Sequence, residues 1–319
     1  MSNIKNGIRI SIARSMIILA IVCMNVGCSG NTQLASIRVP EMPPPVTKPI
    51  ENVNVALVLS SGGFRGAAHI GAIEVLEENH VPIDLIVGCS AGSVIGACYA
   101  DNPNALVLKN SFMSSRYDHF VETSWLGMLQ APFYPTGPVK GKDLQNFMLN
   151  HMQARDFNDL KIPLIVVATS LVNNQIETLQ TGPIIPAVHA SSALPPYFAP
   201  VNMYQNSFVD GGVISPIPVS VAKQYNPKLI IVVDITNKPS ITSPKNAFQI
   251  TGRAIDISRF ELSKSQASLA DIVIRPDIIG YSTFDDDYVE DFYLAGRRAA
   301  LAHLDEIKAA VLKINQQAP

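Results

Sequence analysis

The chain has 319 residues, of which 47% are hydrophobic and 16% are charged, and its formal net charge is −2. This balance gives no basic surface for nucleic acid, so we expect no nucleic-acid partner. After an N-terminal leader, the remaining length suits one large α/β unit.

The N-terminus has the pattern of an export signal. Three basic residues, Lys5, Arg9 and Arg14, precede an apolar stretch at 16–24. A membrane-spanning helix needs about 20 apolar residues, and this stretch supplies fewer than half of them. We therefore predict that residues 1–27 are a signal peptide.

The end of this segment, Val26-Gly27-Cys28, resembles a bacterial lipobox. The resemblance implies that Cys28 becomes the lipid-modified first residue of the mature protein and attaches it to a membrane surface. An ordinary cleaved signal peptide is the alternative. Ser29 stands where an aspartate is the usual cue for inner-membrane retention. The expected location is therefore the periplasmic face of the bacterial envelope, with the outer membrane favoured over the inner.

Residues 28–52 are predicted to form a proline-rich tether. They contain five prolines between positions 40 and 49 and almost no apolar periodicity, so they cannot bury enough surface to fold. A proline-rich segment extends by about 3.1 Å per residue, which gives this one a reach of roughly 70 Å. A catalytic core is expected at 53–223, and strands and helices at 224–319 would complete the same domain.

The first folded segment has the layout of an anion-binding site. A buried strand is expected at 54–60, followed by a glycine-rich loop at 61–66 and a helix at 67–78. Glycines let the backbone approach a ligand closely, and free amides at the start of a helix point toward negative charge. A dinucleotide loop is the alternative, but the G-x-G-x-x-G spacing is not met and no acidic residue ends the second strand. An oxyanion hole with the amides of Gly62 and Gly63 as donors fits better.

The sequence Gly88-Cys89-Ser90-Ala91-Gly92 places a serine where an apolar strand passes into a helix of small residues. This pattern is typical of a nucleophile elbow, although G-x-S-x-G alone also arises by chance. Ser90 would lie on a strained turn, where side chains at Gly88 and Gly92 would collide with the neighbouring strand and helix. The helix amides behind Ser90 would stabilise developing negative charge.

Other segments carry weaker signals. The stretch 111–135 holds the only tryptophan, with several aromatic residues and methionines, and predicts either a cap that receives acyl chains or ordinary core packing. Asp285-Asp286-Asp287 precedes a helix from Tyr288 onward, where capping is favoured over a calcium site. Cys89 and Cys98 are not expected to form a disulfide, and no metal-ligand spacing is present.

Further along, residues 205–209 are expected to form a short strand that ends in Asp210-Gly211-Gly212. Asp-Gly-Gly is also an ordinary turn. Together with the glycine loop and G-x-S-x-G, however, it completes three motifs whose order resembles that of the patatin-like phospholipases. The segment 190–200 also resembles the proline-rich stretch that this family carries before its aspartate, and the whole resemblance covers about 55–223.

The resemblance implies a role for each matching residue. Ser90 would be the nucleophile and Asp210 its base. The oxyanion loop would comprise Gly62, Gly63 and Gly66, with Arg65 as its basic residue. Ser61 departs from the pattern, because the family usually has its first glycine there.

A serine hydroxyl needs a base within hydrogen-bond reach, and partial burial would raise the pKa of Asp210 and make it a better base. A histidine triad is the alternative, for which His303 is the only histidine after Asp210. Asp234, which follows the apolar run 229–233, is a substitute base of lower rank. His69 and His189 are assigned structural roles.

The alternation of buried apolar strands with helices predicts an α/β fold, a three-layer α/β/α sandwich around a mostly parallel sheet. The expected function is that of a serine lipid acyl hydrolase, which cleaves carboxyl esters of phospholipids through an acyl-enzyme and needs no cofactor or metal. The alternatives are an esterase or thioesterase with a histidine triad and an inactive lipid-binding lipoprotein.

Overall fold

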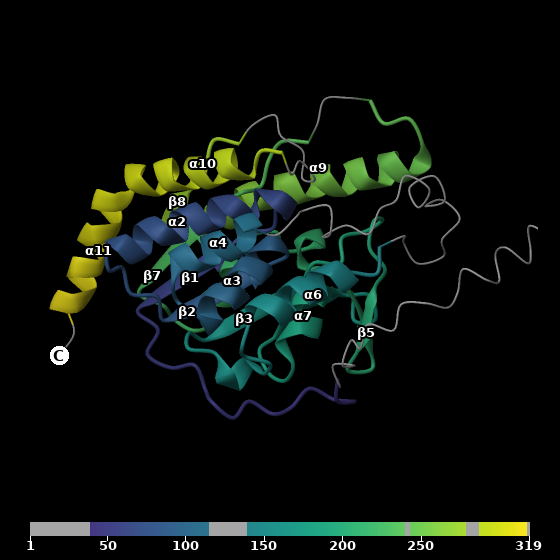
Figure 1. The fold of residues 1–319 in the computed structure, drawn as a ribbon, viewed down its shortest axis with the longest axis horizontal. Coiled ribbons are helices and arrows are strands. Elements are labelled where there is room, and N and C mark those ends of the chain that lie inside the picture. Colours follow the sequence, from purple (N-terminus) through teal and green to yellow (C-terminus); the bar gives the residue numbers. More distant parts are fainter. Residues whose placement is uncertain (1–38, 115–138, 240–242, 279–286, 318–319) are drawn as a thin grey trace, which may run out of the picture. The chain divides into compact units, whose positions relative to one another are not determined.

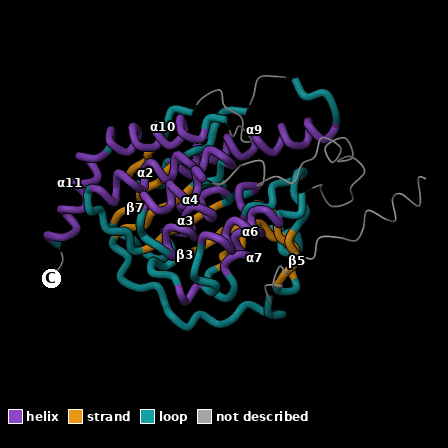
Figure 2. The backbone as a smooth tube through the Cα atoms, viewed as in Figure 1, coloured by secondary structure: helices purple, strands orange, loops and turns teal. Residues whose placement is uncertain are grey.

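The computed structural model describes residues 39–114, 139–239, 243–278 and 287–317. Within them, the chain forms one eight-stranded sheet with helices on both faces (Figures 1 and 2). The strands are β1 (Val55–Leu59), β2 (Leu85–Cys89), β3 (Leu164–Ser170), β4 (Gln175–Leu179), β5 (Val201–Met203), β6 (Asn206–Asp210), β7 (Leu229–Val233) and β8 (Ile272–Ile274).

Helices of very different length join these strands. The α-helices are α2 (Ala67–Glu78), α3 (Ala91–Asp101), α4 (Ala105–Ser114), α6 (Lys142–His151), α7 (Ile184–Ser191), α8 (Val219–Lys223), α9 (Ala247–Ala267), α10 (Val289–Ala302) and α11 (Leu304–Gln316). Short 3₁₀ helices are η1 (Gly63–Gly66), η4 (Phe157–Asp159) and η5 (Gly211–Val213).

The sheet has the strand order β5-β6-β3-β2-β1-β7-β8, and β4 also pairs with β3. Strands β3, β2, β1, β7 and β8 are parallel neighbours, whereas β4, β5 and β6 pair antiparallel. Every residue of β1 and β7 is buried, as expected for parallel strands covered on both faces. The prediction of a mostly parallel sheet is therefore confirmed.

Helical layers cover both faces of this sheet. On one face, Val219 of α8 and Ala267 of α9 join Val58 of β1 in a single buried cluster. On the other face, α3 packs so closely that a Cβ on its Gly96 would lie 3.0 Å from the side chain of Ile86. Helix α7 packs beside α3, and α10 packs on α2. This arrangement confirms the predicted three-layer fold.

Residues 39–52 form neither helix nor strand, but they lie against the folded domain. Hydrogen bonds join Thr47 Oγ1 to Asn158 Oδ1 at 2.8 Å and Gln205 Nε2 to Glu41 Oε1 at 3.1 Å. Residues from Val39 onward belong to one compact unit. The prediction of a free tether at 28–52 is therefore wrong for residues 39–52, because side-chain hydrogen bonds hold them on the domain.

Some predicted segments fall outside the described residues. Of the stretch 111–135, only Ser111 to Ser114 are described, at the end of α4, where Phe112 is buried. Asp285 and Asp286 also lie outside, and α10 begins directly after Tyr288. In the part of the chain that is described, no helix combines the length and apolar character needed to cross a bilayer.

Helices α2 and α10 pack with almost no space between their backbones. A Cβ on Gly71 of α2 would lie 2.1 Å from the carbonyl oxygen of Tyr293, and a Cβ on Gly296 of α10 would lie 2.0 Å from that of Ala68. Glu74 of α2 accepts hydrogen bonds from Tyr293 and Arg297 at the same interface. Glycine at both crossing points is therefore needed for this packing.

We expect Gly71→Ala to destabilise the protein by about 1–3 kcal/mol, because the added methyl group forces the two helices apart. Alanine favours helix over glycine by about 1 kcal/mol, so helix propensity alone would act in the opposite direction. Thermal and urea unfolding measure the change, with Ala309→Leu on the exposed face of α11 as the control. Unchanged or raised stability of Gly71→Ala would contradict the close packing.

Candidate active site

Two strand ends meet on one edge of β3 and bring Ser90 and Asp210 together. Strand β2 runs parallel to β3 and ends with Cys89 opposite Val167. Strand β6 runs antiparallel to β3 and ends with Asp210 opposite Ala168. Because Val167 and Ala168 are consecutive, the carboxyl ends of β2 and β6 face each other. The structure therefore brings together the predicted nucleophile and its predicted base.

Ser90 occupies a strained turn between β2 and α3, with φ 53° and ψ −121°. A Cβ on Gly88 would lie 2.7 Å from the carbonyl oxygen of Gly92, and a Cβ on Gly92 would lie 2.1 Å from that of Leu59. Glycine is thus required on both sides of the serine. Helix α3 begins at Ala91, so the positive end of its dipole adjoins Ser90.

A serine from the proline-rich segment holds this turn in place. The amide of Ser90 donates to Ser191 Oγ at 2.9 Å, and Ser191 Oγ donates to the carbonyl oxygen of Val167 at 2.7 Å. Ser191 therefore links the nucleophile turn to the central strand β3. This role has no local signal in the sequence, because the contact joins residues far apart in the chain.

Asp210 is completely buried at the end of β6. Its Oδ1 accepts a hydrogen bond of 2.7 Å from the amide of Gly212, while Oδ2 makes no well-formed hydrogen bond within the described residues. Burial raises the pKa of the Asp210 carboxyl, and the charge of Arg259, the Ser90 hydroxyl and the Gly212 amide lower it by smaller amounts. The net effect is a raised pKa, as a general base requires.

The glycine-rich loop lies at the ends of β1 and β7. The amide of Ser61 donates to the carbonyl oxygen of Pro216 at 2.9 Å, and Ser61 does not adopt a positive φ. Gly63 does, at 61°, which explains the glycine there. A Cβ on Gly62 would lie 2.4 Å from the Ile235 side chain. Neither amide of Gly62 and Gly63 donates to another described residue, so both are available to an oxyanion.

The remaining loop residues support this arrangement. Arg65 is buried, and its Nε donates to the carbonyl oxygen of Gly62 at 3.0 Å, so its side chain braces the loop. Gly66 packs against α3, since a Cβ there would contact the methyl group of Ala91 at 3.4 Å.

A cavity that opens to solvent adjoins Ser90. Aromatic and aliphatic side chains form most of its wall, which suits an acyl chain better than a polar group. The lining residues are Gly63, Phe64, Gly66, Ser90, Ala91, Val94, Ile95, Phe112, Leu144, Ser192, Leu194, Phe198 and Arg259.

The histidines singled out in the sequence have other partners. His69 Nε2 lies 2.9 Å from the carbonyl oxygen of Ser60, and His189 Nδ1 lies 2.9 Å from Gln145 Nε2. Burial lowers the pKa of each to about 4. His303 is partly exposed between α10 and α11 and pairs with Glu306 at 3.1 Å. It follows the last residue of α10 and directly precedes α11.

Asp234 also serves the fold. It is buried after β7, and its Oδ2 accepts from Arg275 Nε at 2.9 Å while Oδ1 accepts from the Thr236 amide at 2.9 Å. These contacts cap the loop, in keeping with its low rank as a substitute base. Cys89 and Cys98 are both buried free thiols. Among the described residues, no three His, Cys, Asp or Glu side chains gather as metal ligands would.

We expect Asp210→Asn to stabilise the fold at neutral pH. The folded-state pKa of Asp210 lies above its unfolded value, so stability falls as the pH rises through the folded-state pKa and the carboxyl becomes charged. Asparagine keeps an acceptor for the Gly212 amide but carries no charge. Thermal unfolding should show a higher Tm than wild type at pH 7 and a difference that shrinks toward zero in acid. A variant that melts well below wild type at pH 7 would show instead that the carboxylate stabilises the fold.

The region that contains the candidate site is similar in sequence to known proteins. The family model described as patatin-like phospholipase matches residues 57–223, just over half of the chain. The chain is 24% identical over 275 residues to lysophospholipase NTE1 of Debaryomyces hansenii, covering 77% of this chain and 18% of that protein. It is 32% identical over 184 residues to patatin-like phospholipase domain-containing protein 6 of Mus musculus, covering 57% of this chain and 13% of that protein.

These two relatives are much longer proteins, and the chain spans less than a fifth of their length. Among solved structures, VipD from Legionella pneumophila has a similar fold, with a TM-score of 0.50 and 15% identity over 81% of this chain and 67% of that one. The matched family region contains the glycine loop, the Ser90 turn and Asp210 in the order that the sequence predicted. The chain belongs to the patatin-like phospholipase family.

Proposed function

We propose that this protein is a serine lipid acyl hydrolase that cleaves carboxyl esters of phospholipids through a Ser90–Asp210 dyad. The observation that carries the proposal is the meeting of these two residues beside a largely apolar cavity. The names of the relatives, a lysophospholipase and a phospholipase domain protein, support a phospholipid substrate.

In the first half of the reaction, the Asp210 carboxylate takes the proton from Ser90 Oγ as that oxygen attacks the ester carbonyl carbon. The carbonyl oxygen becomes an oxyanion, which the amides of Gly62 and Gly63 stabilise. The carbon–oxygen bond to the alcohol then breaks, and the leaving alcohol takes the proton from Asp210. An acyl chain on Ser90 occupies the apolar cavity.

In the second half, Asp210 takes a proton from water, which attacks the acyl-enzyme and forms a second oxyanion at the same amides. The bond to Ser90 breaks, Asp210 returns the proton to Ser90 Oγ, and the fatty acid leaves. Each half-reaction restores the starting state of Asp210, so no cofactor is consumed. The raised pKa of Asp210 favours its role as proton acceptor and donor in both halves.

Under the same proposal, the enzyme works at the bacterial envelope. Lipid modification of Cys28 would hold it on the periplasmic face, at the outer rather than the inner membrane. The support for this location is the sequence alone: the basic residues and apolar stretch before the lipobox, and Ser29 after Cys28. A lipid anchor would bring the cavity to its substrate without a spanning helix.

We expect Ser90→Ala to abolish fatty-acid release from phospholipid vesicles and labelling by a fluorophosphonate probe. Asp210→Asn should reduce turnover by about 10²- to 10⁴-fold, because it removes the base. The double variant should be little worse than Ser90→Ala, since the two residues act as a unit. His303→Ala should stay within a few-fold of wild type.

The controls are Ser258→Ala on α9 and Asp305→Asn on α11, which change an exposed serine and an exposed aspartate. Loss of activity in a folded His303→Ala protein, together with an active Asp210→Asn protein, would refute the dyad. A folded wild-type protein that the probe does not label would support the inactive lipid-binding alternative.

We expect mass spectrometry of the mature protein from a bacterial host to find an N-terminal peptide that begins at Cys28 with acyl groups attached. Cys28→Ser should accumulate as the uncleaved precursor, because the lipidated thiol is missing. A conservative change next to it, Ser29→Thr, is the matched control. An unmodified N-terminus after residue 28, or one that retains Met1, would exclude the lipid anchor.

A further inference from the structure

Arg259 is a buried cation at the candidate active site, and the sequence analysis did not single it out. It lies on α9, its side chain is only 7% exposed, and it lines the cavity together with Ser90 and Gly63. Helix α9 lies outside the region 57–223 that the family model matches. Burying a guanidinium is unfavourable unless nearby groups compensate its charge, so its partners indicate its role.

The three guanidinium nitrogens of Arg259 face three different groups. Nη2 donates to Ser61 Oγ at 2.9 Å, and Nη1 lies 3.6 Å from Asp256 Oδ1. Nε is buried and has no hydrogen-bond partner among the described residues. It lies beside Gly212, where a Cβ would be 3.0 Å from Nε, 3.0 Å from Ser61 Oγ and 2.9 Å from Asp210 Oδ1. The guanidinium therefore lies between the glycine-rich loop and the Asp210 turn.

The contact to Ser61 concerns the one position where the glycine loop departs from its family pattern. A glycine at 61 would have no side-chain oxygen for Arg259 to bind. The hydroxyl of Ser61 provides that acceptor directly before Gly62 and Gly63, whose amides are the oxyanion donors. Arg259 can thus fix the loop that binds the oxyanion and, through its charge, influence the base.

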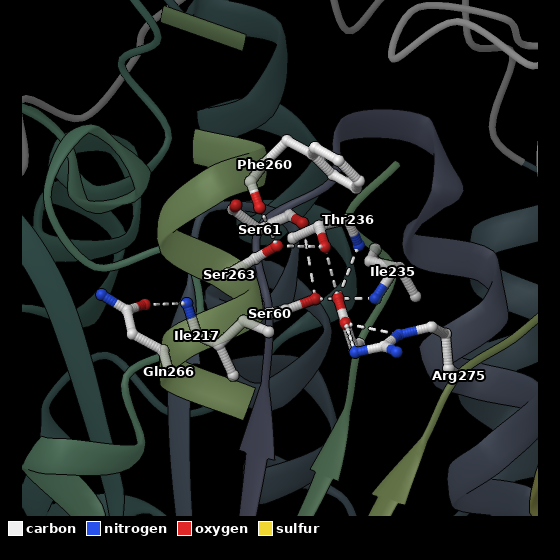
Figure 3. A network of polar contacts seen from close by, with 10 residues as sticks. Ser60, Ser61, Ile217, Ile235, Thr236, Phe260, Ser263, Gln266 and Arg275 are labelled. Atoms are coloured by element: carbon white, nitrogen blue, oxygen red, sulfur yellow. Dashed lines mark hydrogen bonds and ion pairs between the residues drawn. The ribbon is translucent and has the colours of Figure 1, made fainter. Parts of the chain in front are cut away.

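Helix α9 does not depend on Arg259 for its attachment. Farther along the helix, Ser263 Oγ lies 3.0 Å from Thr236 Oγ1 (Figure 3). Gln266 donates to the carbonyl oxygen of Ile214 at 3.0 Å and accepts from the amide of Ile217 at 2.9 Å, and so holds the segment that follows Asp210-Gly211-Gly212. These bonds would remain if Arg259 were replaced, so a substitution tests the guanidinium rather than the position of the helix.

We propose that Arg259 is a positioning residue for the Ser90–Asp210 dyad, which ties the oxyanion loop to the Asp210 turn and keeps the Asp210 carboxyl ionised so that it can accept the serine proton. The inference rests on the proposed function, because it assigns Arg259 a part in the same reaction.

The charged and titratable groups around Asp210 support this role. Cys89, at the end of β2, is a buried thiol whose pKa burial raises well above its usual value, so it is neutral. Asp256, the ion-pair partner of Arg259, also interacts electrostatically with Arg65 and Arg253. The charge of Arg259 opposes the effect of burial on the pKa of Asp210.

Two substitutions separate the charge of Arg259 from its shape. Arg259→Gln removes the charge but keeps a hydrogen-bond donor. Arg259→Lys keeps the charge but replaces the planar guanidinium group with a compact ammonium group. Ser61→Ala removes only the acceptor, and Arg298→Gln, at an exposed position of α10, is the charge-matched control. The measurement is kcat/KM against pH, with a neutral p-nitrophenyl ester and with phosphatidylcholine vesicles.

Arg259→Gln should lower kcat/KM by roughly 10- to 100-fold at neutral pH on both substrates. The acid limb of its pH profile should move to higher pH, so that activity recovers in part in alkaline solution. Arg259→Lys should keep the wild-type acid limb with reduced kcat, and Arg298→Gln should match wild type. An unchanged acid limb in Arg259→Gln overturns the proposal. So does a defect confined to KM for the phospholipid, which would make Arg259 a headgroup ligand.

A second measurement needs no turnover. Asp210→Asn should stabilise the Arg259→Gln protein more than it stabilises wild type at pH 7, because the carboxylate has then lost its compensating charge. Equal stabilisation in the two backgrounds overturns the inference even if the enzyme is active. If wild type hydrolyses no ester but this coupling is present, the proposed function fails while the electrostatic link between Arg259 and Asp210 stands.

Discussion

The register of two strands on one edge of β3 is the constraint on which the site depends. Strands β2 and β6 end opposite Val167 and Ala168, and each delivers one member of the dyad. A shift of one residue in either strand would turn its side chains to the other face of the sheet. The sheet hydrogen bonds therefore set the geometry of nucleophile and base. Gly211 permits the approach, because a Cβ there would lie 2.2 Å from the carbonyl oxygen of Val167.

The same constraint places Asp210 where water does not solvate it. Burial makes the carboxylate a stronger base, and it makes the charged form costly to the fold. Three elements oppose this cost without removing the basicity: the Gly212 amide, the Ser90 hydroxyl and the charge of Arg259. The pKa of Asp210 must be low enough for the carboxyl to ionise and high enough for it to accept the serine proton. The surrounding groups set this pKa.

The parts of this structure that could be predicted are those that neighbouring residues encode. Apolar runs predicted β1 and β7, and glycines around Ser90 predicted the turn. Strand β4 was not predicted because only the last residue of its sequence QIETL is buried, and β5 was not predicted because it has only three residues. The end of α10 before His303 could not be predicted from the sequence, because the amphipathic pattern continues from α10 into α11. Ser191 and Arg259 have no local signature, because packing of distant elements gives them their partners.

The C-terminal third of the chain completes the walls of the site. Strand β7 pairs with β1 in the middle of the sheet, and the amide of Ser60 donates to the carbonyl oxygen of Val233 at 3.2 Å. The amide of Ile235 donates in turn to Ser60 Oγ at 2.8 Å, and its side chain packs on Gly62. Without this strand, the edge of β1 would be unpaired and the oxyanion loop would lose its support. Residues beyond the family motifs therefore determine where the oxyanion donors point.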